Sequence, residues 1–151
     1  MSVTRRSQGS PVADPLRALR DFFARRAPDE VLAAYLFGSR AHGAGMPLSD
    51  FDVGLVLDPK DRSDPRMRFD LRVDVTGELI QALDWNDVDV VVLNDVPPTL
   101  AARAATEGTP LFCRDARRLR EFVRDVQLMA ADLRPFLQRM EKRLLERLST
   151  S

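Results

Sequence analysis

The chain has 151 residues, and its 23 Lys and Arg balance 23 Asp and Glu, so the formal net charge is zero. This length suits a single domain, and the balanced charge argues against a general nucleic-acid coat, which would be basic. Apolar residues make up 44% and charged residues 30% of the chain. Such a composition is typical of a globular protein and excludes a wholly disordered one.

Three features bear on the compartment. The longest apolar run, Val31–Phe37, has seven residues, far short of the roughly 20 that a membrane helix needs. The single Cys113 excludes an intramolecular disulfide, and together with the single His42 it makes no zinc site. Residues 1–13 are polar, and we expect a disordered leader without a secretory signal. These features lead us to expect a cytoplasmic protein.

The first half of the chain predicts one helix and two strands. The helix begins at Asp14-Pro15, with Asp as the cap and Pro in the first turn, and ends near Arg26. Val31–Phe37 reads as a buried strand, followed by a loop rich in small residues over 38–49. Asp50–Leu57 reads as a second strand, whose alternation places Asp50 and Asp52 on one face.

The second half predicts alternating helices and strands. The apolar residues of the segment 67–83 fit both the alternation of a strand and the repeat of a helix. The length of the segment favours a helix. The following elements are a strand over 88–93, a short helix over 97–107, a short and possibly edge strand over 110–113, and a helical segment over 115–148. Pro135 should break that last segment into two helices or kink it. Strands that alternate with helices predict an α/β or α+β domain.

The informative segment is Gly38-Ser39, then ten residues, then Asp50-Phe51-Asp52. A Gly after a buried strand lets the backbone approach a ligand, and the Ser hydroxyl with neighbouring N–H groups can hold a phosphate. Two carboxylates close together repel and are stable mainly with a hard cation such as Mg²⁺ between them. Asp89 adds a charge within the apolar strand over 88–93, where a lone Asp would be unfavourable without a partner. Asp87 is a rival on the same face.

This pattern resembles the GS-x10-DxD signature of the DNA polymerase beta-like nucleotidyltransferase superfamily. The surrounding stretches, FGSRAHGAGMPLSDFDVGLVL and VDVVVLNDVPPTL, look more narrowly like the minimal nucleotidyltransferases, the MntA-type antitoxins of HEPN–MNT toxin–antitoxin pairs. The resemblance runs from about Val31 to Cys113. It implies a polymerase beta-like fold, a small mixed β-sheet flanked by helices, with a nucleotidyltransferase domain over 14–114 and a C-terminal helical extension over 115–151.

The resemblance also implies roles for particular residues. Gly38 and Ser39 would grip the triphosphate of ATP, and Arg40 is a further candidate for contact with the phosphates. Asp50, Asp52 and Asp89 would be the catalytic carboxylates and would bind two Mg²⁺ ions. The reaction would transfer AMP to a tyrosine hydroxyl of a HEPN ribonuclease toxin, which the modification silences. The implied partner is that toxin, in a hetero-oligomer, with no membrane and no direct nucleic-acid binding.

Two alternative functions and one question of packing remain open. The chain could be a non-catalytic antitoxin that acts by binding alone, although three intact carboxylates weigh against this. It could be a small-molecule, antibiotic-type nucleotidyltransferase, but the roughly 40 residues after Cys113 leave little room for a substrate domain. The third open point is the segment 115–148, whose long apolar stripe either packs on its own domain or grips a partner.

Overall fold

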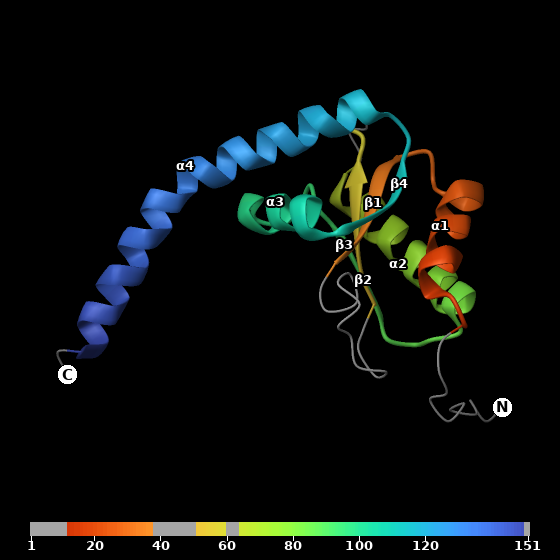
Figure 1. The fold of residues 1–151 in the computed structure, drawn as a ribbon, viewed down its shortest axis with the longest axis horizontal. Coiled ribbons are helices and arrows are strands. Elements are labelled where there is room, and N and C mark those ends of the chain that lie inside the picture. The colour runs from red at the N-terminus through yellow and green to blue at the C-terminus, as the bar shows by residue number, and fades with distance from the viewer. Residues whose placement is uncertain (1–11, 38–50, 60–63, 150–151) are drawn as a thin grey trace.

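The computed structural model of the protein describes residues 12–37, 51–59 and 64–149. Most of the expected leader, 1–13, lies outside this range. The described elements follow one another in the order expected from the sequence (Figure 1). They are α1 (Pro15–Arg26), β1 (Val31–Phe37), β2 (Phe51–Leu57), α2 (Pro65–Leu83), β3 (Val88–Val92), α3 (Pro98–Glu107), β4 (Thr109–Cys113) and α4 (Ala116–Ser149).

The four strands form one mixed sheet in the order β3-β2-β1-β4. β1 pairs antiparallel with both β2 and β4, whereas β2 and β3 run parallel. The parallel pair is connected through α2, as a crossover between parallel strands requires. The predicted small mixed sheet flanked by helices is therefore confirmed, and β4 lies at an edge as the sequence suggested.

Helices cover both faces of the sheet, so the apolar core has two parts (Figure 1). On one face α1 and α2 contribute Leu19, Phe22, Phe23, Val75, Leu79 and Leu83, which pack on Val53, Leu55, Val90 and Val92 of β2 and β3. On the other face α3 and the beginning of α4 contribute Ala101, Ala104, Phe122 and Val126, which pack on Leu32, Tyr35 and Val56. Because both faces are buried, the strands read as nearly continuous apolar runs.

Local signals located the helix starts well. The Asp14 carboxylate accepts a hydrogen bond from the N–H of Arg17, at 3.1 Å, as the predicted cap of α1. The ambiguous segment over 67–83 is the helix α2, which begins at Pro65 because Asp64 caps it through the N–H of Met67. Its helical period outweighed the strand-like alternation, as its length predicted.

The last helix, α4, is one continuous element from Ala116 to Ser149 with Pro135 inside it. Of the two outcomes expected at Pro135, a break is wrong and a kink is right: Figure 1 shows α4 bent part-way along its length. Proline has no N–H to donate to the carbonyl of Ala131, and its ring crowds that carbonyl, which bends a helix without ending it. None of the described helices, α4 included, is long and apolar enough to cross a membrane.

Candidate functional site

Asp52 and Asp89 lie side by side at one end of the parallel strand pair. Each is the second residue of its strand, and the register of β2 with β3 pairs them directly. Neighbouring strands are about 4.8 Å apart, and partners in register point to the same face of a sheet. Asp52 shares its face with Val56, which packs against α3 and α4. Both carboxylates therefore leave the sheet on the α3–α4 side.

The same end of the sheet leads into the remaining predicted residues. Phe37, the last residue of β1, is the register partner of Asp52, and Gly38 follows it directly in the chain. Gly38, Ser39, Arg40 and Asp50 lie outside the described residues, so their assignment stays a prediction. The fold nevertheless puts Phe37, the residue that precedes the GS segment in the chain, beside the second carboxylate of the DxD motif on the neighbouring strand.

The position of Asp89 corrects one argument made from the sequence. We reasoned that a charge inside an apolar strand needs a partner because its burial is unfavourable. β3 is an edge strand, however, and the Asp89 side chain is 59% exposed, with the Arg72 guanidinium 3.6 Å from its carboxylate. Because Asp89 is exposed, burial gives no support for a metal at this residue. The support comes from the register, which places Asp89 beside Asp52.

The register also separates Asp89 from its rival. Asp87 precedes β3, and its backbone carbonyl accepts a hydrogen bond from the N–H of Phe51, at 2.9 Å. The residue that stands beside Asp52 is Asp89. The choice between them could not be made from the alternation alone, because both residues lie on the same face of an extended segment.

Arg72 is the residue near the site that the sequence reasoning missed. It lies one turn after Arg68 on α2, and each arginine pairs with a carboxylate of the β3 segment. Arg68 is 2.9 Å from Asp95, beyond the far end of the strand. Both arginines line a hollow of about 300 Å³ between α2 and β3. Their i, i+4 spacing on a helix that follows the DxD strand was the available signal, since such residues share a helix face.

A titratable group on the same side of the sheet is Tyr35 of β1. Burial raises the pKa of the Tyr35 phenol, and the nearby Cys113 thiol raises the pKa further. Tyr35 packs in the core between the sheet and the α3–α4 layer. It therefore stays neutral and structural, and it is not a proton donor or acceptor for chemistry near neutral pH.

The donor set fits a hard divalent cation as far as the described residues go. Carboxylate oxygens are the ligands that Mg²⁺ prefers, and Asp52 and Asp89 offer two of them from adjacent strands. Within 12–37, 51–59 and 64–149, no group of three or more His, Cys, Asp or Glu side chains is placed to hold a metal ion. The third predicted ligand, Asp50, directly precedes Phe51 and belongs to the part outside these ranges.

Comparison with known proteins identifies the family. The family model for the polymerase beta nucleotidyltransferase domain matches residues 18–117, more than half of the chain. The chain belongs to this nucleotidyltransferase family. No curated protein matches it. The matched range contains Gly38-Ser39, both residues of the DxD motif and Asp89, so the family match covers every residue predicted for the site.

Solved structures share the fold at low sequence identity. A chain of the tri-AMPylated Shewanella oneidensis HEPN toxin in complex with MNT antitoxin aligns with a TM-score of 0.64 and 22% identity, covering 86% of this chain and 98% of that one. A chain of a toxin–antitoxin crystallised with AMP-PNP gives a TM-score of 0.54 and 23% identity, covering 90% and 98%. A chain of the MntA–HepT toxin–antitoxin gives 0.54 and 20%, covering 89% and 97%. At these identities the likeness establishes the fold.

Proposed function

We propose that this nucleotidyltransferase transfers AMP from ATP to a tyrosine hydroxyl of a cognate HEPN ribonuclease toxin, and that it thereby acts as the antitoxin. The observation that carries the proposal is the direct register of Asp52 with Asp89 beside the end of β1. The solved relatives include a HEPN toxin that carries AMP in complex with its MNT antitoxin. The family supplies the reaction class, and the relatives supply the class of acceptor.

In this proposal the residues divide into two groups. Asp50, Asp52 and Asp89 hold two Mg²⁺ ions, and Gly38, Ser39 and Arg40 hold the phosphates of ATP. The bound cations supply Lewis-acid stabilisation of the charge that develops on the phosphate oxygens. The acceptor hydroxyl would give its proton to the Asp89 carboxylate and attack the α-phosphate. A new P–O bond would form, and pyrophosphate would leave with the bond between the α- and β-phosphates broken. The chain's own contribution is to orient the reactants and fix the carboxylates.

The domain division of the proposal follows the same evidence. We assign the transferase domain to residues 14–114 and the extension to 115–151. Within the described residues, everything after Asp115 is the single helix α4. The solved relatives named as toxin–antitoxin complexes support a protein acceptor over a small molecule.

The proposal is tested by intact-mass spectrometry of the HEPN protein encoded beside this chain, coexpressed with the wild-type chain or with Asp52→Asn. We expect the partner mass to rise by one or more AMP units with the wild-type chain only. Asp89→Asn should behave like Asp52→Asn, whereas Asp87→Asn, two residues away and outside the strand, should still modify the partner. A partner that is bound and silenced but never gains mass would show that the chain acts by binding alone.

A further inference from the structure

The second part of α4 buries none of its residues against the described part of the molecule. We call residues 128–149 the arm. Only Phe122 and Val126 of α4 are buried, whereas the large apolar side chains of the arm are exposed: Leu128, Met129, Leu133, Phe136, Leu137, Met140, Leu144, Leu145 and Leu148. A monomer rarely exposes a contiguous apolar surface of more than a few hundred Å², so an arm of this kind marks an interaction site.

Most of these side chains form one stripe along the arm. Leu133, Leu137, Met140, Leu144 and Leu148 follow at intervals of four, three, four and four residues. This spacing continues the buried face of Phe122 and Val126, and it keeps the residues on one side of a helix with 3.6 residues per turn. Intervals of three and four are those with which one helix packs along another. The stripe therefore fits a helix better than a flat or extended partner.

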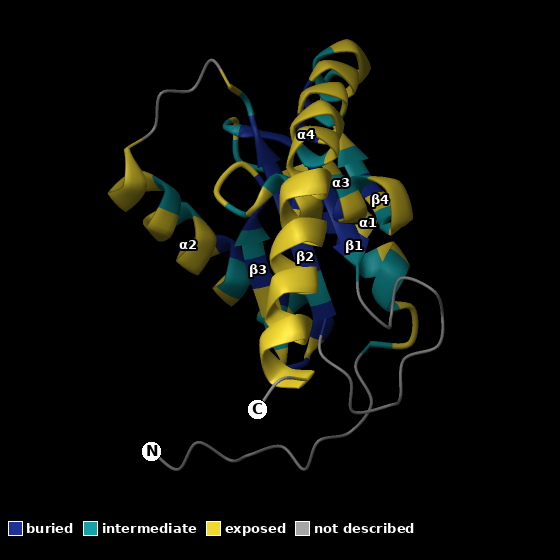
Figure 2. Cartoon of the chain, turned by 90° about the vertical axis from the view of Figure 1, so that its left-hand side faces the viewer, coloured by how far each residue is buried: buried dark blue, intermediate teal, exposed yellow. Residues whose placement is uncertain are grey.

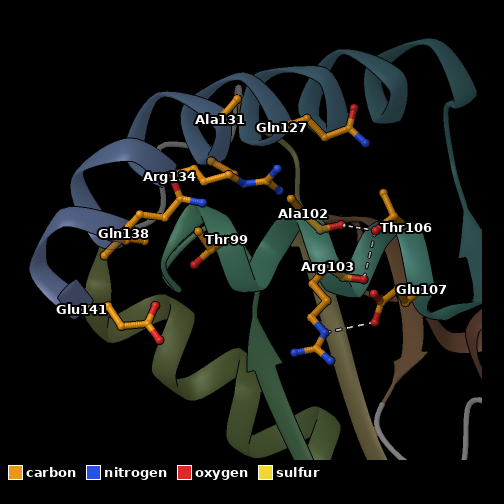
Figure 3. A pocket seen from close by; sticks show the side chains of 12 residues that line it. Thr99, Ala102, Arg103, Thr106, Glu107, Gln127, Ala131, Arg134, Gln138 and Glu141 are labelled. Atoms are coloured by element: carbon orange, nitrogen blue, oxygen red, sulfur yellow. Dashed lines mark hydrogen bonds and ion pairs between the residues drawn. The ribbon is translucent and has the colours of Figure 1, made fainter. Parts of the chain in front are cut away.

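The side of the arm next to α3 carries both polar and apolar side chains. A groove of about 610 Å³ lies between α3 and residues 127–141 of α4, and Figure 3 shows Arg134 and Gln138 of α4 reaching toward α3 across it. Thr99, Arg103 and Glu107 of α3 line the opposite wall. Ala102 of α3 and Ala130, Ala131 and Leu137 of α4 line the groove as well. Beyond Val126, however, no described residue of α4 is buried.

The arm stands on the side of the sheet that carries the candidate site. Figure 2 views the molecule from that side, where the second part of α4 overlaps β2, and Figure 1 shows that it stands away from the sheet, beyond α3. In Figure 1 the arm runs from the top of the molecule toward the bottom, where β2 and β3 begin. Asp52 and Asp89 lie at those strand beginnings. A protein that binds the arm from inside the bend is thus brought to the face that bears both carboxylates.

The charges of the arm select among possible occupants. The arm has five basic residues, Arg134, Arg139, Lys142, Arg143 and Arg147, against three acidic residues, Asp132, Glu141 and Glu146. Arg139, Arg143 and Arg147 follow every fourth residue and form a basic row along one flank of the stripe. In an antiparallel pair of two arms this row would face its own copy, and like charges would repel. Asp or Glu on the facing flank of another protein would instead be attracted.

We infer that the arm is the docking surface for an α-helix of the acceptor protein, with apolar residues against the stripe and Asp or Glu against the basic row. The inference rests on the proposed function, because it takes the docked protein to be the acceptor of AMP. At about 1.5 Å per residue the arm is about 33 Å long. A stable interface buries roughly 800 Å² on each partner.

The experiment compares two double variants that differ only in the helix face they change. The stripe variant is Met140→Glu/Leu144→Glu, and the control is Leu128→Glu/Leu145→Glu. The four side chains are similarly exposed, at 53%, 60%, 55% and 59% in that order, and Glu is a good helix former in every case. Binding of the HEPN protein encoded beside this chain is measured by calorimetry, together with the circular dichroism and Mn²⁺ affinity of each variant alone.

We expect the stripe variant to bind the partner about 100-fold more weakly or worse, because central apolar side chains dominate interface affinity. The control should bind within about threefold of the wild-type chain, and both variants should keep their helix content and Mn²⁺ affinity. Equal affinities for the two variants would overturn the inference. The inference would also be overturned if the wild-type chain formed dimers or bound anionic vesicles and the stripe variant abolished that association.

The outcomes also separate this inference from the proposed function. If the inference is right, the stripe variant modifies the partner at high partner concentration and fails only at low concentration, whereas Asp52→Asn fails at every concentration. If the partner is never modified and the stripe variant still loses binding, the proposed function fails and the docking surface stands. If the partner is modified and both variants bind it equally well, the docking surface fails and the proposed function stands.

Discussion

Replacing Arg72 with Ala tests whether Asp89 is a metal ligand without measuring any turnover. The Arg72 guanidinium is 3.6 Å from the Asp89 carboxylate, and both side chains are about half exposed. At this separation in water-like surroundings two unit charges attract by about 1 kcal/mol. Exposed ion pairs contribute between about 0 and 1 kcal/mol to stability, so the free energy of unfolding should barely change.

The effect on a divalent cation should be larger than the effect on stability. A cation that binds Asp52 and Asp89 has to displace Arg72 from the carboxylate or share it, so removal of Arg72 favours the cation. A gain of about 1 kcal/mol corresponds to roughly fivefold tighter binding. We therefore expect Arg72→Ala to bind Mn²⁺ up to about fivefold more tightly than the wild-type chain in the absence of nucleotide.

The assay is a titration with Mn²⁺ followed by electron paramagnetic resonance, which counts free and bound cations directly. Arg68→Ala is the matched control, because Arg68 lies one turn earlier on α2 and pairs with Asp95 at the other end of β3. It removes the same charge from the same helix but leaves Asp89 as it is. Unchanged or weaker Mn²⁺ binding by Arg72→Ala would refute the reasoning. An equal gain in Mn²⁺ affinity in both variants would show an effect of net charge and not of the contact with Asp89.

Three further predictions concern the site and the scaffold. Asp52→Asn should lower AMP transfer by about 100-fold or more at unchanged thermal stability, measured by partner mass and by calorimetric melting. Gly108→Ala should destabilise the chain by about 1–3 kcal/mol, because the new Cβ would lie 2.2 Å from the carbonyl oxygen of Ala104, whereas Gly77→Ala, with nothing within 4 Å, should stabilise it by about 0.5–1 kcal/mol. Chemical denaturation of the two variants measures both values, and destabilisation by Gly77→Ala would contradict this account of α2. The raised pKa of Tyr35 means that its neutral phenol contributes stability fully below about pH 10 and loses it as the pH rises further, so Tyr35→Phe should make unfolding less sensitive to pH above that value.

Much of this fold could be predicted locally. Asp14 with Pro15 indicated the start of α1, and apolar runs indicated β1 and β3. The length of the segment 67–83 indicated that α2 is a helix. Each of these signals depends on residues within a few positions of one another, because capping and side-chain periodicity are local properties of the backbone. The GS-x10-DxD spacing likewise identified the family before any strand was paired.

Strand register was beyond the reach of the local signals. Asp87 and Asp89 lie on the same face of an extended segment, and only the pairing of β3 with β2 puts Asp89 beside Asp52. The edge position of β3 also exposes Asp89 and lets Arg72 reach it from α2. Register and strand order are set by contacts between segments far apart in the chain, so no window of sequence contains them.

The sequence by itself therefore determined the elements, the family and the candidate carboxylates, since those follow from periodicity and motif spacing. The tertiary structure alone decided which carboxylates are neighbours and which part of the apolar stripe on α4 is covered. Periodicity states that a helix has an apolar face but not what covers it. Here the sheet and α3 cover Phe122 and Val126. The face beyond them stays exposed because the helix, which is bent part-way along its length, extends away from the sheet.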